Sequence, residues 1–125
     1  MEDLKLPPHN LEAEQSVLGA LLIDSEAVPI VTGILKANHF YRENHRQIYE
    51  TMLRLYAKSE PIDLITLSDA LAQRGLLEQV GDVQYLTLLA NLVPSSAVAG
   101  HYAQIVQNKA ILRDLINASQ QISAA

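Results

Sequence analysis

The stretch SAVAGHYAQIVQNKAILRDLINASQQISAA, residues 96–125, decides the class of fold. It contains no proline, and its single glycine, Gly100, lies near its start, so nothing after that point interrupts a helix. At about 1.5 Å per residue such a helix is roughly 40 Å long, which is longer than a domain of this size needs. We therefore expect an all-α protein that ends in a long helix.

Apolar residues of this helix are predicted to form two faces. One face is expected to belong to the core and comprises Val98, Tyr102, Ile105, Leu112 and Ile116. A second face begins beyond Lys109, with members spaced four, three and four residues apart: Ile111, Leu115, Ala118 and Ile122. Because one globule covers only one side of a helix, we expect the second face to pair with another subunit or with a second helix. The chain ends without a glycine, proline or basic last turn, so we expect a fragment cut inside or just after a helix, whose partner helix belongs to a hairpin or to another subunit.

The preceding residues read as a compact bundle of shorter helices. Asn10 is expected to cap a helix over residues 11–22, with Glu12 and Glu14 near the positive end of its dipole. A second helix is expected to start near Asp24, provided that Pro29 lies in its first turn.

Three further helices follow from apolar periodicity. One covers residues 48–56 and is closed by Pro61; the next opens with a capping box at residues 66–69 and ends at Gly75 in left-handed geometry. The last contains Tyr85 and stops at Pro94. No strand alternation is visible. We expect residues 1–9 to form a flexible arm, residues 10–94 a globular helical domain, and residues 95–125 the long helix.

Composition narrows the class of protein. Of the 125 residues, 49% are hydrophobic, none is cysteine, and the formal net charge is −5. Disulfides and thiolate metal sites are thereby excluded, and a domain whose main task is to grip polyphosphate is disfavoured. No apolar run is long enough to cross a bilayer, and the start lacks the plan of a signal peptide. A cytosolic protein fits best.

No pattern in the sequence indicates catalysis, a metal or a cofactor. The histidines lack the spacing of a helical zinc pair, and no glycine leads into a phosphate-binding loop. Acidic pairs such as Asp63 with Asp69, or Glu12 with Glu14, are explained by helix caps and dipoles. The four histidines are His9, His39, His45 and His101.

One basic strip offers an alternative function. It is the best candidate for a nucleic-acid strip and predicts a single-stranded DNA contact domain, although Glu43 and Glu50 interrupt it and no aromatic platform accompanies it. The strip consists of Arg42, Arg46, Arg54 and Lys58.

Short motifs spread over nearly the whole chain stand in a characteristic order. They are PPHNLEAEQSVLG at residues 7–19, Phe40-Tyr41, His45-Arg46, Pro61-Ile62-Asp63-Leu64 with Thr66-Leu67, Arg74-Gly75, Gly81 with Tyr85-Leu86, Pro94, and HYAQIV at residues 101–106 with Lys109 and Arg113. This series resembles the amino-terminal domain of the hexameric bacterial replicative DNA helicase, the DnaB family. Each motif alone is weak, whereas their order and spacing are specific.

The resemblance implies an all-helical head followed by a hairpin, a linker helix and a RecA-like motor, which uses ATP and Mg to translocate 5′ to 3′ on single-stranded DNA. This chain stops before the motor, so no helicase activity and no cofactor is expected here. The resemblance also implies self-association into a trimer-of-dimers collar, through the second apolar face, and docking of the helicase-binding domain of primase. DNA would be contacted mainly by the motor, and whether a helicase loader binds here stays open. The cell would be bacterial, or the compartment a plastid. Carried over by position, the primase-facing residues are Tyr85, Ile116 and Ile122.

Overall fold

The computed structural model describes residues 6–93 and 95–124, and within these ranges it is helical and contains no strand. This confirms the predicted all-α class. None of the described helices is long and apolar enough to span a membrane. The helices are α1 (Leu11–Ile23), α2 (Val28–Thr32), α3 (Glu43–Ala57), α4 (Leu64–Gln73), α5 (Leu77–Val80), α6 (Asp82–Leu92) and α7 (Ala99–Ala124), with 3₁₀ turns η1 (Ser25–Ala27), η2 (Ala37–His39) and η3 (Ser96–Val98).

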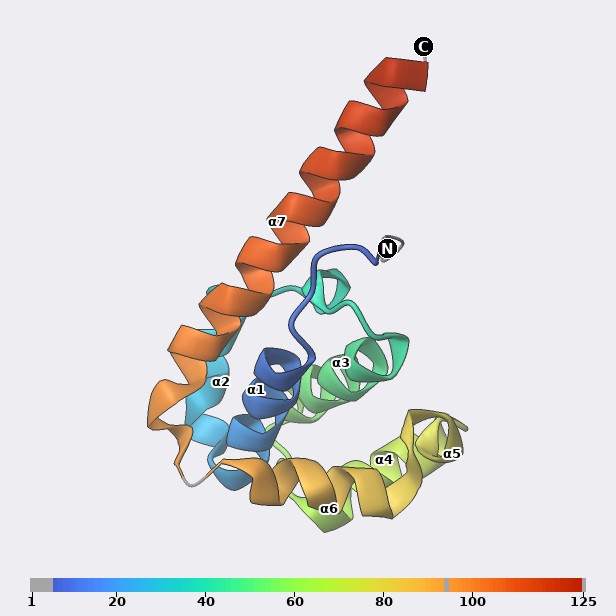
Figure 1. Cartoon of the computed structure of the whole chain (residues 1–125). Helices are drawn as coiled ribbons and strands as arrows, with labels where there is room; N and C mark the ends of the chain where they lie inside the picture. Colours follow the sequence, from blue (N-terminus) through green and yellow to red (C-terminus); the bar gives the residue numbers. More distant parts are fainter. Residues whose placement is uncertain (1–5, 94, 125) are drawn as a thin grey trace.

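The first helix, α1, lies at the centre of the molecule and packs against α3, α6 and α7 (Figure 1). Val17, Leu18 and Leu21 on α1 are fully buried. Gly19 lets α6 approach closely, because a Cβ at this position would collide with the backbone carbonyl oxygen of Leu89. The three helices that pack on α1 therefore meet around it to form one core.

The core between α3 and η2 is built from two aromatic side chains. Phe40 and Tyr49 are both fully buried, with ring centroids 5.0 Å apart. The Tyr49 hydroxyl donates a hydrogen bond of 3.0 Å to the carbonyl oxygen of Leu35. Burial raises the pKa of Tyr49 to about 12. The segment that leads into α3 is thereby fixed to α3 itself.

Some helix boundaries agree with the sequence and others do not, since α3 begins at Glu43, before the predicted range 48–56, and α4 has a different cap. Asn10 caps α1, since its side chain accepts a hydrogen bond of 2.9 Å from the Ala13 N–H, and Pro29 lies in the first turn of α2. The capping box predicted at residues 66–69 is wrong. Asp63 caps α4 instead by accepting from the Thr66 N–H at 2.8 Å, so the helix starts at Leu64.

Left-handed glycines separate the helices at the far end of the globule. Gly75 follows α4 with φ of 70°, as predicted, and Gly81 has φ of 117° between α5 and α6. The short helix α5 was not predicted. Helix α6 ends at Leu92, whereas the prediction that Pro94 stops it falls on a residue outside the described ones.

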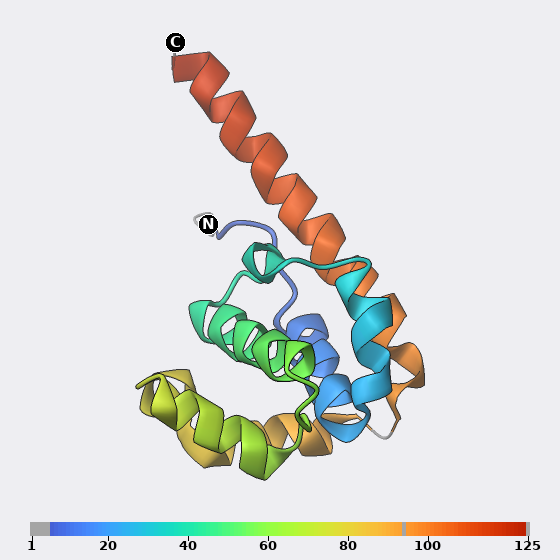
Figure 2. The same cartoon turned by 180° about the vertical axis from the view of Figure 1, so that it is seen from behind.

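The molecule has the shape of a globule with a rod attached (Figures 1 and 2). Helices α4, α5 and α6 lie at the end of the globule away from the free end of α7, and both views show α7 extending well beyond the other helices. The amino-terminal arm runs from α1 toward the middle of α7.

Candidate functional site

The carboxy-terminal half of α7 leaves the globule. Every described side chain from residue 114 to residue 122 is exposed. Leu115 is 61% exposed and Ile122 is 77% exposed, which is unusual for large apolar residues on one helix. This half of α7 is the candidate docking surface.

The buried side of α7 agrees only in part with the one predicted, since Tyr102 and Ile105 are half-buried and pack against the core as expected. The sequence placed Leu112 and Ile116 in the core, but they are 44% and 42% exposed. Val98, expected on the same face, is 41% exposed. Leu112 and Ile116 lie beyond Ala110, the last buried residue of α7, where the helix leaves the globule (Figure 1). The buried positions are Ala99, Ala103, Val106 and Ala110.

Four exposed residues form one apolar stripe on the free half of α7. At about 100° per residue, they fall within an arc of roughly 60° on the helix surface. Three of them are large: Ile111 is 47% exposed, and Leu115 and Ile122 are more exposed still. No side chain of this chain's described residues buries the stripe. The four are Ile111, Leu115, Ala118 and Ile122.

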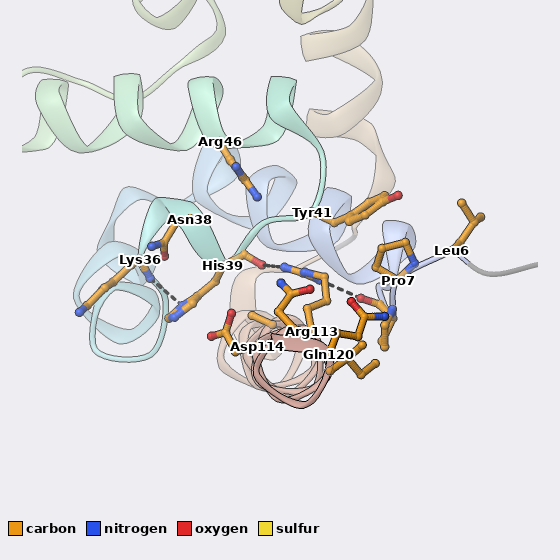
Figure 3. Close-up of a pocket in the computed structure, with 14 residues that line it drawn as sticks. Leu6, Pro7, Lys36, Asn38, His39, Tyr41, Arg46, Arg113, Asp114 and Gln120 are labelled. Carbon is orange, nitrogen blue, oxygen red and sulfur yellow. Dashed lines mark hydrogen bonds between the residues drawn. The ribbon is translucent and has the colours of Figure 1, made fainter. Parts of the chain in front are cut away.

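Polar side chains of α7 fix the helix to the globule where it emerges. Gln107 donates through Nε2 to the carbonyl oxygen of Ile34 at 3.0 Å. Arg113 donates through Nη1 to the carbonyl oxygen of Pro8 at 2.9 Å and through Nη2 to that of His39 at 2.7 Å (Figure 3). The arm, η2 and α7 are thus joined at one point, which sets the direction of the free half.

Tyr85 lies elsewhere, near the start of α6 and at the opposite end of the molecule from the free end of α7 (Figure 1). The structure therefore does not bring it together with Ile116 and Ile122. Its ring is half-buried and stacks on His45, with centroids 5.9 Å apart. Any surface that uses all three residues must be large or must be composed of several copies of the chain.

A buried polar network holds the hydroxyl of Tyr85. His45 is fully buried, with Nε2 at 2.6 Å from the Tyr85 hydroxyl and Nδ1 at 2.7 Å from Oε1 of Glu14. Gln15 donates to the same hydroxyl at 3.1 Å. A neutral imidazole with its proton on Nδ1 matches each donor to an acceptor: Tyr85 then donates to Nε2 and His45 donates to Glu14.

The sequence pattern explained Glu14 by the helix dipole alone, and the structure shows that this explanation is incomplete. The residue is 1% exposed, and its Oε2 accepts from the Tyr41 N–H at 2.7 Å. The available signal was position: Glu14 shares a helical face with Val17, Leu18 and Leu21, all of them core residues. A charge on an apolar face indicates a buried hydrogen-bonded group.

The basic strip does not form one surface. Arg42 is exposed, whereas Arg46 is half-buried and lines a cavity beside α7. Arg54 and Lys58 line a different cavity of about 490 Å³, together with the carboxylate of Glu60. A continuous track for a nucleic-acid backbone is therefore absent from these four positions.

Within the described ranges, no group of three or more histidine, aspartate or glutamate side chains lies close enough to hold a metal ion.

The sequence comparisons agree with the geometry. The model of the family described as DnaB-like helicase N terminal domain matches residues 6–108. The chain is 45% identical over 119 residues to the replicative DNA helicase DnaC of Bacillus subtilis. It is 43% identical over 119 residues to the replicative DNA helicase DnaB of Leifsonia xyli. Both matches cover 95% of this chain and 26% of the relative, so the chain spans about a quarter of the length of these curated relatives.

Solved structures give the same result. The N-terminal domain of the DnaB helicase from Mycobacterium tuberculosis is similar with a TM-score of 0.93 and 42% identity, over 95% of this chain and 86% of that one. A DnaB-like replicative helicase, whose structure is described together with its interactions with primase, matches with a TM-score of 0.77 and 33% identity. That match covers 92% of this chain and 27% of the other.

Proposed function

Since the chain belongs to the family of DnaB-like helicase N-terminal domains, we propose that it is the assembly and primase-docking domain of a hexameric replicative DNA helicase. In this role the domain itself catalyses no reaction. Unwinding from 5′ to 3′, with ATP and Mg as cofactors, is carried out by a motor in another part of the protein. The proposed setting is DNA replication in the cytoplasm.

The observation that carries the proposal is the free half of α7. Ile111, Leu115 and Ile122 expose apolar surface in a row on the isolated domain. Burying that surface against a partner is favourable by about 25 cal/mol per Å². Helices with such a stripe pair with other helices. We assign the stripe to contacts between copies of the chain, which build dimers and then a trimer of dimers.

The second proposed contact is with the helicase-binding domain of primase. The residues proposed for it are Tyr85, Ile116 and Ile122. The related helicase described with its interactions with primase supports this partner. The functional division that accompanies the proposal is an arm over residues 1–9, a globular domain over residues 10–94 and the docking helix over residues 95–125.

Placing a charge on the exposed apolar surface of α7 tests the primase contact. Ile122→Asp should weaken binding of the primase domain by about 1–3 kcal/mol in a calorimetric titration, because truncating an interface anchor costs that much. Gln121→Asp is the matched control: it adds the same charge at an exposed neighbouring position, and it should bind like the wild type. Equal affinity for the wild type and both variants would remove Ile122 from the contact.

Tyr85 needs two variants, since its ring and its hydroxyl have different surroundings. Tyr85→Ala removes the ring and should weaken primase binding, while Tyr85→Phe keeps the ring and loses only the hydrogen bonds to His45 and Gln15. A ring contact predicts near-normal binding by Tyr85→Phe. Equal loss in both variants, with the fold intact by circular dichroism, would assign the effect to the buried network instead.

A further inference from the structure

A second exposed apolar surface lies on α6, at the end of the globule away from the free end of α7 (Figure 1). Tyr85, Leu88 and Leu92 follow one another at intervals of three and four residues. At about 100° per residue they therefore fall within an arc of roughly 60° on one side of the helix. Leu88 and Leu92 are exposed, and Tyr85 is half-buried.

Helix α1 extends this surface. Gln15 donates to the Tyr85 hydroxyl at 3.1 Å, and Gly19 lies against the carbonyl oxygen of Leu89. Both helices advance by four residues between these two contacts, so the next turn of α1 brings Ile23 toward the end of α6. Ile23 is exposed as well. We call the apolar surface made by this residue and the three on α6 the α6 face.

The α6 face is bordered by negative charge. No lysine or arginine occurs at residues 6–35 or 75–108, the two stretches that contain α1 and α6. Carboxylates lie within one turn of both ends of the face, and they belong to Glu12, Asp82 and Glu26. Glu12 and Glu26 are exposed. The surface is therefore apolar in its centre and acidic at its ends.

This charge determines which occupant fits. A second copy of the chain docked through the same face would bring its own carboxylates to the contact, and like charges disfavour such an interface. An amphipathic helix edged by lysine or arginine would bury the two leucines and would also pair with the carboxylates. A basic helix is thus complementary to the face, and a second copy is not.

We propose that the α6 face docks an amphipathic helix of another protein, apolar on one side and basic along its edges. Tyr85 is its fixed anchor, because the ring stacks on the fully buried His45 and the hydroxyl lies 2.6 Å from His45 Nε2. An anchor that is already ordered loses little side-chain entropy on binding. The choice of Tyr85 rests on the proposed primase contact, whereas Ile23, Leu88 and Leu92 are assigned from exposure and charge alone.

The test uses the whole chain and a synthetic amphipathic peptide with leucine on one side and lysine on the other. It is titrated at constant ionic strength and followed by amide chemical shifts in ¹⁵N spectra. We expect saturable shifts on α6, centred on Gln84, Leu88 and Asn91. The same peptide with glutamate in place of lysine should bind at least about tenfold more weakly, because its charges oppose the carboxylates. Equal binding of the two peptides would overturn the proposal, as would shifts that leave α6 unchanged or no shifts up to about 1 mM peptide.

Two aspartate variants on α6 make the test specific. Leu88→Asp places a charge in the middle of the face and should weaken binding of the lysine peptide at least about tenfold, as loss of a central anchor does. Val83→Asp is the matched control, since Val83 is 42% exposed, close to the 46% of Leu88. It lies roughly 140° from Leu88 around the helix and should bind like the wild type. Equal affinity of the two variants would overturn the proposal.

The carboxylates need variants of their own. Glu12→Gln combined with Glu26→Gln should weaken binding of the lysine peptide about two- to fivefold at low salt, and the difference should vanish at high salt. Glu50→Gln is the control, because Glu50 is exposed on α3 rather than on α1 or α6. Equal binding of the double variant and of the control at low salt would contradict the acidic border.

The primase domain as a second ligand separates this inference from the proposed function. If the wild-type chain does not bind the primase domain while Leu88→Asp still weakens peptide binding, the proposed function fails and the α6 face stands with another partner. If the primase domain binds and Leu88→Asp weakens it more than Val83→Asp does, the docked helix belongs to primase. Unchanged affinity of Leu88→Asp for both ligands overturns the inference alone.

Discussion

Glu14 is the buried charge on which the start of α3 depends. Its carboxylate accepts from the Tyr41 N–H and from His45 Nδ1, both at 2.7 Å, and from the Arg42 N–H at 3.4 Å. A carboxylate offers only acceptors, which suits a site surrounded by donors. The side chain therefore joins α1 to the segment before α3 and, through His45, to Tyr85 on α6.

Replacing this carboxylate by an amide should destabilise the fold. In Glu14→Gln the amide nitrogen must face at least one of the donors, so one charge-assisted hydrogen bond is lost at a cost of about 1.5–3 kcal/mol. Urea unfolding followed by circular dichroism measures the loss. Glu12→Gln is the control, because Glu12 is exposed on the same turn and its change should cost almost nothing. Equal stability of the two variants would show that the network contributes little.

His39 gives the fold a defined dependence on pH. The pKa of His39 is lowered from the ordinary value of 6.5, first by burial and then by Lys36 and Arg113. The unfolded chain therefore takes up this proton at higher pH than the folded chain. Stability from this group is fully present above pH 6.5 and is lost as the pH falls toward the folded-state pKa.

The variant His39→Gln should reveal that loss. The difference in unfolding free energy between the wild type and His39→Gln, measured in urea, should become smaller from about pH 7.5 to about pH 5, because only the wild type has the titrating group. His101→Gln, at an exposed position on α7, is the matched variant for comparison. A difference that stays constant with pH would contradict the assignment to His39.

The contact between α1 and α6 depends on a missing side chain. In Gly19→Ala the new Cβ would meet the carbonyl oxygen of Leu89, which belongs to backbone and cannot rotate away. The two helices must separate, and overpacking of this kind costs about 1–3 kcal/mol even after the better helix propensity of alanine. Thermal unfolding should show a clear drop in midpoint.

Gly33→Ala is the control for the glycine change. Its Cβ would lie 3.5 Å from the nearest carbonyl oxygens, which is an ordinary contact, and its φ of −70° suits any residue. We expect a midpoint close to that of the wild type. A similar drop in both variants would mean that the α1 and α6 contact is not the cause.

The long helices could be predicted from the sequence, whereas some of their boundaries could not. Asn10 caps α1 and Gly75 adopts the left-handed conformation after α4, both as predicted, because a cap or a left-handed turn depends only on neighbouring residues. The start of α4 had two candidate caps, and Asp63 prevails because the earlier start lets Leu64 pack against the core. Helix α5 has only four residues, too few to show a period.

The buried face of α7 shows where apolar periodicity misleads. The pattern gives weight to large residues such as Leu112 and Ile116, yet those two are exposed and the buried positions include Ala103 and Ala110. Close approach of two helix axes favours small side chains, and a sequence does not reveal which neighbour a helix will meet. The stripe that remains exposed was predicted more reliably, since Ile111 and Leu115 lie on a side that nothing in the described globule reaches.

Only part of the candidate docking surface could be predicted from the sequence. The sequence indicated a spare apolar face on the last helix, and the structure leaves that face exposed. The separation of Tyr85 from the α7 residues and the split of the basic strip were beyond the sequence, because both depend on how α3 and α6 lie relative to α7. Contacts between distant segments carry no local pattern.

Self-association through the stripe is the prediction that concerns the assembly. Two copies that pair along α7 would bury Ile111, Leu115 and Ile122 together, so the wild-type chain should sediment as a dimer whose population rises with concentration. Leu115→Asp places a charge in the middle of the stripe and should weaken the dimer at least about tenfold, as loss of a central anchor does. Gln120→Asp adds the same charge at an exposed position on the opposite side of the helix and should leave the dimer intact. If the wild type and both variants sediment identically, the stripe does not join copies of this chain, and its partner must be a different protein.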